Sequence, residues 1–170
     1  KGSYMRYQVN IPDGVSGDYK VVNEESYTKL YQLINSEWLV IMEDNEKEAA
    51  EAEDFLNAAT GDILLAGLGL GMVVQPLIDN ESVTSITIVE KFQEVIDLVW
   101  SHVPQSNKVR LITDDIYTWT PDKDFDVAWF DSWICPIDGT DPYGTYLTEM
   151  KTKYESSVGV GHFWPYGVTW

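Results

Sequence analysis

The sequence predicts a three-layer α/β fold around a parallel sheet with strand order 3-2-1-4-5. From residue 62 onward, short apolar runs alternate with helical patterns, and such runs are typical of parallel strands that are buried on both faces. We expect right-handed crossovers to join these strands. The chain has 170 residues, the length of a single domain. The five apolar runs are residues 63–66, 86–89, 109–112, 127–130 and 158–163.

The first 44 residues predict a small β hairpin unit ahead of this sheet. Residues 7–11 alternate apolar and polar side chains, residues 12–14 form a turn signal, and residues 19–22 can pair back as the second strand. Apolar residues within 28–35 predict a short helix, and the continuous apolar run 38–42 predicts a strand. We therefore divide the chain into an N-terminal extension, residues 1–44, and an α/β unit, residues 45–170.

Helices are also expected in the α/β unit. Asn45 caps a helix that ends at Ala59, and Glu48 stands three residues on, as in a capping box. Apolar residues at helical spacing predict a second helix over residues 92–103, and Asp141 begins a third. Few residues follow the last predicted strand, so we expect a shortened C-terminus. The sheet edge that it leaves exposed is a place where a second copy of the chain could pair, as a homo-oligomer.

The charge of the chain argues against several classes of partner. Eleven Lys and Arg residues against 28 Asp and Glu residues give a formal net charge of −17, and such a surface repels nucleic-acid phosphates and anionic membranes. It is typical of a solvated surface, and it also favours a cationic ligand. One cysteine, two histidines and no tight ligand pattern predict no metal site. No run is long and apolar enough for a membrane span or a leader, so we expect a cytoplasmic location.

A glycine-rich turn follows the first predicted strand directly. Its pattern, Gly67-Leu68-Gly69-Leu70-Gly71, lets the backbone bend tightly and lets a ligand approach the main chain. The helix expected behind it, from about Val73, presents free N–H groups to an anionic group. A dinucleotide fingerprint would need glycine at position 72, where Met72 stands, so a nicotinamide oxidoreductase is disfavoured. The sequence also has no G-K-[ST] phosphate loop.

Acidic positions follow at the ends of the later strands. Glu90 ends the second predicted strand, nineteen residues after Gly71, while Asp114-Asp115-Ile116 follows the third strand and Asp131-Ser132-Trp133 follows the fourth. Together with the G-x-G-x-G turn, these segments resemble the class I S-adenosylmethionine-dependent methyltransferases. Within that class they resemble the spermidine-synthase-like group, through Val89-Glu90-Lys91 and Phe130-Asp131-Ser132. The resemblance covers roughly residues 60–135 and implies a Rossmann-like fold that binds S-adenosyl-L-methionine.

The resemblance also implies a role for individual residues. Glu90 would accept hydrogen bonds from both ribose hydroxyls, and because it ends a strand we expect its replacement to leave stability unchanged. Asp115, with Asp114 as the alternative, would accept from the adenine amino group, while the N–H of Ile116 donates to the ring. Asp131 would be the catalytic residue and would orient the acceptor or the methionine amino group. The implied cofactor-binding residues are Gly67, Leu68, Gly69, Gly71, Glu90, Lys91, Asp115, Ile116, Asp131 and Trp133.

The sequence leaves the acceptor open. Aminopropyltransferases carry D-x-x-D-P, and aligning Asp131 with the first aspartate puts Ile134 at the second, so polyamine synthesis is disfavoured. The [ND]-P-P-[YF] signature of many N-methyltransferases is missing, and Cys135 stands in the wrong order for cytosine-C5 chemistry. His162, near the end of the last strand, is a candidate base. We predict a methyltransferase with a small-molecule acceptor; the alternatives are a non-catalytic cofactor-binding protein, a subunit of a complex, or an aminopropyltransferase-like enzyme.

Overall fold

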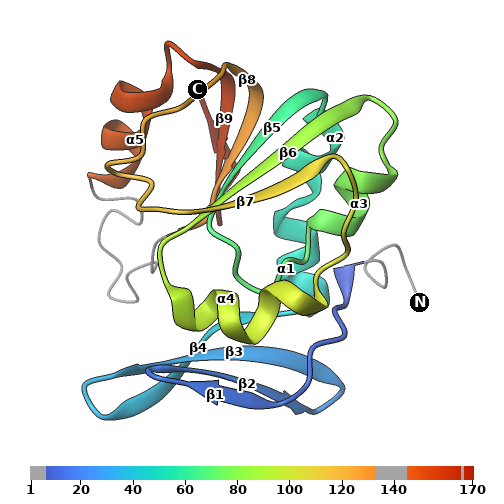
Figure 1. Ribbon diagram of the computed structural model, residues 1–170, viewed down its shortest axis with the longest axis vertical. Coiled ribbons are helices and arrows are strands. Elements are labelled where there is room, and N and C mark those ends of the chain that lie inside the picture. The colour runs from blue at the N-terminus through green and yellow to red at the C-terminus, as the bar shows by residue number, and fades with distance from the viewer. Residues whose placement is uncertain (1–6, 133–144, 166) are drawn as a thin grey trace.

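The computed structural model describes residues 7–132, 145–165 and 167–170. It contains a four-stranded antiparallel sheet in the order β1-β2-β3-β4 and a six-stranded sheet in the order β10-β9-β8-β5-β6-β7. Figure 1 shows the four-stranded sheet at one end of the molecule, with helix α4 (Gln93–Val99) between it and the six-stranded sheet. The predicted α/β fold class, with a parallel central sheet and a small N-terminal β unit, is confirmed.

The N-terminal unit is larger than the hairpin that the sequence predicts. Its strands are β1 (Gly14–Ser16), β2 (Tyr19–Glu24), β3 (Tyr27–Ile34) and β4 (Glu37–Glu43), each antiparallel to the next. The strand predicted at residues 7–11 is wrong, because this segment lies outside both sheets. The backbone N–H of Val9 donates instead to the Asp44 carboxylate at 3.0 Å.

The helix predicted over residues 28–35 is also wrong, because this segment is strand β3. Tight turns with two central residues flank it, and φ is 56° and 71° at Glu25 and Ser26, and 51° and 67° at Asn35 and Ser36. Positive φ at both central residues is typical of two-residue hairpin turns, which normally contain glycine. Since glycine is missing from both turns, the sequence lacks the usual signal for these hairpins.

The parallel strands of the six-stranded sheet coincide with the five apolar runs. They are β5 (Gly61–Ala66), β6 (Val83–Glu90), β7 (Val109–Thr113), β8 (Phe125–Phe130) and β9 (Val158–Phe163). Numbered along the chain, these five strands lie side by side in the order 3-2-1-4-5. The short strand β10 (Val168–Thr169) then pairs antiparallel with β9 at that edge of the sheet.

The helices are short, and none in the described part of the chain is long and apolar enough to cross a bilayer. The helix predicted from Asn45 to Ala59 is two helices, α1 (Glu46–Glu51) and α2 (Glu53–Ala58), which meet at Ala52. Asn45 caps α1 as predicted, since its side chain accepts the N–H of Glu48 at 2.8 Å. The predicted start of a helix at Asp141 lies outside the described residues. The other helices are α3 (Val74–Asp79), α4 with the 3₁₀ helix η2 (Trp100–His102), and α5 (Tyr146–Tyr154).

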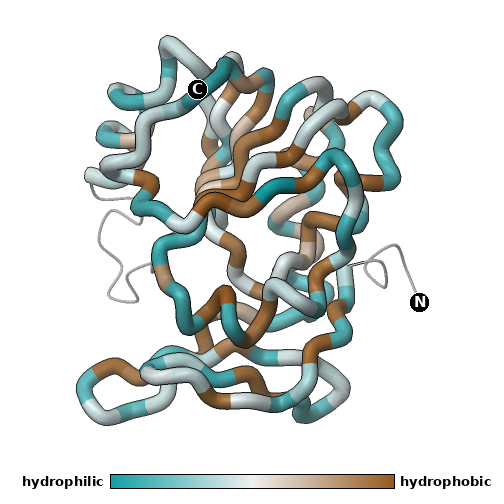
Figure 2. The backbone as a smooth tube through the Cα atoms, viewed as in Figure 1, coloured by the Kyte–Doolittle hydropathy of each residue, from teal (hydrophilic) through white to brown (hydrophobic). Residues whose placement is uncertain are grey.

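The core fills both faces of the six-stranded sheet. On one face, residues of α1 to α4 such as Phe55 and Val99 pack against Ile63 and Ile88. On the other face, α5 and the segment before β8 form a second cluster. Figure 2 shows hydrophobic residues concentrated along the strands of this sheet, as expected for strands buried on both faces.

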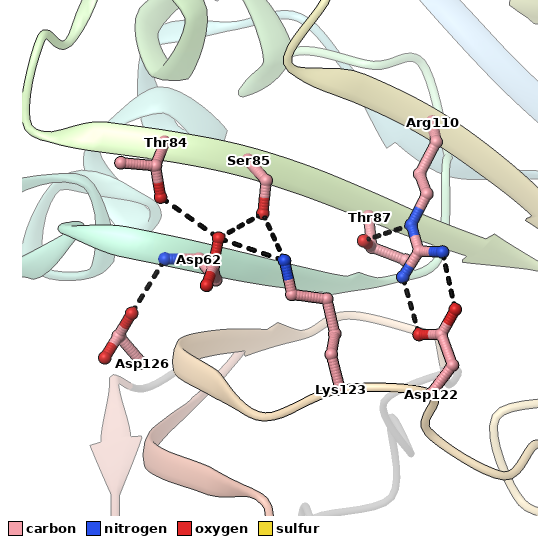
Figure 3. Close-up of polar contacts among 8 residues, drawn as sticks. All are labelled: Asp62, Thr84, Ser85, Thr87, Arg110, Asp122, Lys123 and Asp126. Atoms are coloured by element: carbon pink, nitrogen blue, oxygen red, sulfur yellow. Dashed lines mark hydrogen bonds and ion pairs between the residues drawn. The ribbon is translucent and has the colours of Figure 1, made fainter.

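Polar side chains occupy the α5 face near the amino-terminal ends of the strands (Figure 3). Arg110 donates to the Thr87 hydroxyl at 2.8 Å and forms a two-bond ion pair with Asp122 at 2.7 Å. Lys123 lies 3.1 Å from the Asp62 carboxylate. These pairs satisfy polar groups near the amino-terminal ends of the strands, at the opposite end of the sheet from the site described next.

Candidate functional site

The carboxyl ends of β5, β6 and β8 lie side by side, and hydrogen bonds beyond the strand ends hold them together. The N–H of Gly67 donates to the Val89 carbonyl at 2.9 Å, and the N–H of Asp131 donates to the Ala66 carbonyl at 3.1 Å. Ligands of open α/β sheets bind outside the carboxyl ends of the strands. The topology therefore brings the glycine turn, Glu90 and Asp131 to one edge of the sheet.

A cavity of about 620 Å³ opens at this edge, between the six-stranded sheet and the N-terminal sheet. Small-molecule sites typically have volumes of about 300–1,000 Å³. The predicted cofactor positions that line it are Gly67, Gly69, Glu90, Lys91, Asp115, Ile116 and Asp131. Leu68 and Gly71 line a smaller pocket of about 40 Å³, which shares Gly67 and Asp131 with the large cavity. Trp133 lies outside the described residues.

The glycine turn has a backbone conformation that other residues rarely adopt. Gly67, Gly69 and Gly71 have φ of 106°, 52° and 71°. A Cβ at Gly69 would also lie 2.6 Å from the sulfur of Met42. That sulfur accepts the N–H of Leu70 at 3.1 Å, so strand β4 of the N-terminal sheet holds the turn directly.

Glu90 is more buried than the sequence suggests, with only 7% of the residue exposed. Its Oε1 accepts the N–H of Leu68 at 2.9 Å, and its Oε2 accepts the N–H of Phe92, just before α4, at 3.0 Å. Burial raises the pKa of this carboxyl, while the backbone donors oppose the rise. A carboxylate has about four acceptor positions. The backbone N–H groups of Lys91 and Gly69 also act on this carboxyl. Glu90 therefore links the turn to the start of α4, and it lines the cavity.

Two aspartates shape the loop after β7. Asp114 accepts the N–H of Asp115 at 2.7 Å, and Asp115 accepts the N–H of Tyr117 at 2.9 Å. The other oxygen of Asp115 lies 3.5 Å from the Lys91 ammonium. Both aspartates line the cavity, so both stay candidates for the adenine amino group.

Two carboxyl groups meet at the smaller pocket from elements that are far apart in the sequence. Asp131 follows β8, and Glu48 belongs to α1. Burial raises the pKa of Asp131 to about 8, and the negative charge of Glu51 adds to the rise. Burial likewise raises the pKa of Glu48 to about 8, and repulsion from Asp131 adds to the rise. Each group can therefore take up or release a proton near neutral pH.

Glu48 is a candidate that the sequence interpretation missed, because it assigned this residue to a capping box. The carboxylate accepts the N–H of Glu43 and lines the pocket. A signal was present, because Ala52 and Phe55 follow Glu48 by four and seven residues, which is one face of a continuous helix. Both are buried, so an acid on their face is a site candidate.

A second missed feature is an apolar wall of the large cavity, contributed by strands β3 and β4. We call Leu30, Ile34, Leu39, Val40 and Ile41 the apolar wall. Leu39 and Val40 are 42% and 46% exposed, which is high for apolar residues that line a cavity. The sequence gives little signal for this wall, because apolar residues stand on both faces of β3 and are consecutive in β4.

Of the other candidates from the sequence, His162 lies within the described structure and does not reach the cavity. His162 is buried, its ring centroid lies 5.9 Å from that of Phe55, and it lines neither pocket. Burial lowers its pKa, and within the described structure neither ring nitrogen has a hydrogen-bond partner. Cys135 lies outside the described residues. Among residues 7–132, 145–165 and 167–170, no group of three His, Cys, Asp or Glu side chains is placed to hold a metal ion.

The sheet topology and the cavity at its carboxyl edge define the class of the fold. It is the Rossmann-like fold of S-adenosylmethionine-dependent methyltransferases, which spermidine synthase shares. No protein-family model and no curated protein matches the sequence, so the likeness is structural.

Three solved structures illustrate the likeness. The complex of DhpI with S-adenosylhomocysteine matches 67% of this chain with a TM-score of 0.50 and 22% identity, over 53% of its own length. Spermidine synthase from Thermotoga maritima matches 91% of this chain with a TM-score of 0.57 and 14% identity, over 58% of its length. The glycopeptide N-methyltransferase MtfA matches 67% with a TM-score of 0.50 and 17% identity, over 47% of its length. The chain thus spans about half the length of these proteins, and such identities establish the fold alone.

Proposed function

We propose that the protein binds S-adenosylmethionine in the large cavity and transfers its methyl group to a small-molecule acceptor. The observation that supports this function is the meeting of the glycine turn, Glu90 and Asp131 in one cavity at the carboxyl edge of the sheet. The structures of DhpI and MtfA that share the fold are complexes with S-adenosylhomocysteine, the product of such a transfer.

The residues that line the cavity fit this cofactor. Glu90 lines the cavity at the end of β6, and in this scheme its carboxylate accepts hydrogen bonds from the ribose hydroxyls. Asp115, or Asp114, accepts from the adenine amino group. The cofactor supplies a methyl group that its sulfonium already activates, so the main task of the protein is alignment. Asp131 orients the acceptor in this scheme.

The two parts of the chain contribute different sides of the cavity in this proposal. Strand β4 ends at Glu43 and α1 begins at Glu46, so a boundary near residue 44 separates the two sheets. We assign the cofactor to residues 45–170 and the apolar wall of the cavity to the N-terminal extension.

Calorimetry with S-adenosylmethionine, S-adenosylhomocysteine and NAD tests the cofactor assignment. We expect both adenosyl sulfur compounds to bind and NAD to show no binding, because the turn carries Met72 where a dinucleotide site needs glycine. Preferential binding of NAD would overturn the proposal. Transfer of a labelled methyl group to candidate acceptors then separates a methyltransferase from a cofactor-binding protein without catalysis.

Aminopropyl transfer is the second candidate function, and two observations favour it. The match to Thermotoga maritima spermidine synthase extends over 91% of this chain and so includes the N-terminal sheet. The smaller pocket also has two carboxyl groups, Glu48 and Asp131, and no Lys or Arg among its described lining residues. Such a pocket disfavours the methionine carboxylate and favours a decarboxylated donor. Tighter binding of decarboxylated S-adenosylmethionine than of S-adenosylmethionine, with aminopropyl transfer, would establish this alternative.

A further inference from the structure

The apolar wall of the large cavity contains none of the predicted cofactor-binding residues. It belongs to the N-terminal sheet, whereas the cofactor positions belong to the six-stranded sheet and its loops. The described lining residues from β2, β3 and β4 include Gln32 and Tyr19 but no charged side chain. On a protein with a net charge of −17, an uncharged wall with the half-exposed Leu39 indicates an apolar ligand.

The facing side of the cavity is acidic. Four carboxyl groups line it, from Glu90, Asp114, Asp115 and Asp131, against the single ammonium of Lys91. Lys91 already pairs with Asp115. Because Glu90 and the Asp114–Asp115 loop serve the cofactor in the proposed function, Asp131 is the carboxyl that is left for the acceptor. An ammonium beside Asp131 favours the charged form of this carboxyl, and the two opposite charges attract each other.

We infer that the acceptor is a primary amine with an apolar body, whose ammonium faces Asp131 and whose body lies along the apolar wall. This inference rests on the proposed function and adds the substrate class to it. A second charge on the acceptor would lie against Leu39 and Ile41 without a partner, which is costly in an apolar environment. The cavity therefore favours a monoamine over a diamine.

The methyl transfer that follows is balanced. The acceptor ammonium first gives one proton to the Asp131 carboxylate. The nitrogen lone pair then forms a bond to the methyl carbon while the carbon–sulfur bond breaks, and its electron pair stays on sulfur. The product leaves as a methylammonium ion. Since the pKa of Asp131 is about 8, this group can hold the proton near neutral pH.

Calorimetric titration of the protein saturated with S-adenosylhomocysteine tests the acceptor class. The probes are n-octylamine, n-octanol, octanoate and 1,8-diaminooctane. We expect n-octylamine to bind at least about tenfold more tightly than n-octanol, because a charge-assisted hydrogen bond is stronger than a neutral one. Octanoate should not bind, and the diamine should bind more weakly than n-octylamine.

Variants separate the two halves of the acceptor site. Asp131→Asn should weaken the binding of n-octylamine about tenfold and leave the binding of n-octanol unchanged. Leu39→Asn should weaken n-octylamine by at least about threefold. Leu33→Asn is the matched control, because Leu33 pairs with Trp38 on the other face of the same sheet, whereas Leu39 pairs with Gln32 on the cavity face. Thermal melts show that each variant is folded.

The outcomes separate this inference from the proposed function. Binding of S-adenosylhomocysteine without a preference for n-octylamine over n-octanol overturns the inference and leaves the proposed function standing. The inference also fails if Asp131→Asn weakens S-adenosylhomocysteine and not n-octylamine, because Asp131 then serves the cofactor amino group. Tighter binding of the diamine overturns the inference and favours aminopropyl transfer. Failure of S-adenosylhomocysteine itself to bind overturns the proposed function.

Discussion

Replacement of Glu90 by glutamine tests both the support of the glycine turn and the cofactor site. The buried carboxylate accepts the N–H groups of Leu68 at 2.9 Å and Phe92 at 3.0 Å. Glutamine keeps the shape but converts one acceptor oxygen into an NH₂ donor, so one of these N–H groups loses its partner. A buried donor without a partner costs about 1–3 kcal/mol. Because burial already raises the pKa of Glu90 and disfavours its charge, we expect the lower part of this range, about 1–2 kcal/mol of unfolding free energy.

The same substitution should weaken S-adenosylhomocysteine binding by about tenfold or more, since the side chain keeps one acceptor for two ribose hydroxyls and one tenfold step is about 1.4 kcal/mol. Urea denaturation measures the stability and calorimetry the affinity. Glu81→Gln, at the exposed turn before β6, is the control and should change neither. The difference in affinity between S-adenosylhomocysteine and its 2′-deoxy analogue should also shrink in Glu90→Gln. Unchanged stability refutes the role in the turn, and unchanged affinity refutes the role at the ribose.

The remaining predictions concern pH, packing and the C-terminal strand. The pKa values of Asp131 and Glu48 are raised to about 8 by folding, so their protonated forms favour the folded state, and this stability is lost as the pH rises through about 8. Urea denaturation at several pH values should show that the unfolding free energy of the Asp131→Asn, Glu48→Gln double variant depends less on pH than that of the unsubstituted protein. Met42→Ala should lower the unfolding free energy by about 1–3 kcal/mol and weaken S-adenosylhomocysteine binding, whereas Met42→Leu should cost less than about 1.5 kcal/mol; a loss of stability with intact affinity would contradict its role at the turn. Gly161→Ala should cost about 1–3 kcal/mol because its Cβ would lie 2.5 Å from the Trp170 ring. That cost should largely vanish in a Trp170→Ala background, and a cost that persists would place the clash elsewhere.

The central strands could be predicted because burial on both faces gives continuous apolar runs, as in β5 and β8. Strand β3 could not be predicted in the same way. Leu30 and Ile34 line the cavity while Tyr31 and Leu33 belong to the other face, so apolar residues stand on both faces and the period of two is lost. The Lys20 ammonium lies 5.0 Å from the centre of the Tyr31 ring, so this second face is a mixed polar and aromatic surface.

Some residues of the candidate site could be predicted from the sequence and others could not. The positions of Glu90, Asp115 and Asp131 at the cavity could be predicted because each lies at the end of a strand or within two residues of it. The sheet topology alone brings these strand ends together. Glu48 reaches the smaller pocket through the packing of α1, and Leu39 reaches the large cavity through the packing of the N-terminal sheet. Local sequence patterns do not encode such contacts. The burial of Glu90 was missed for the same reason, because the neighbouring turn and α4 cover it.

Met42 couples ligand binding at the N-terminal sheet to ligand binding at the glycine turn. Its sulfur accepts the N–H of Leu70 in the turn, and the same residue lines the cavity beside the apolar wall. A ligand that shifts β4 therefore shifts the turn. Linkage makes this effect reciprocal, so an acceptor that tightens cofactor binding by a given factor is itself bound more tightly by that factor when the cofactor is present. If the protein transfers a methyl group as proposed, coupling of this sign means that departure of the methylated product weakens the binding of S-adenosylhomocysteine.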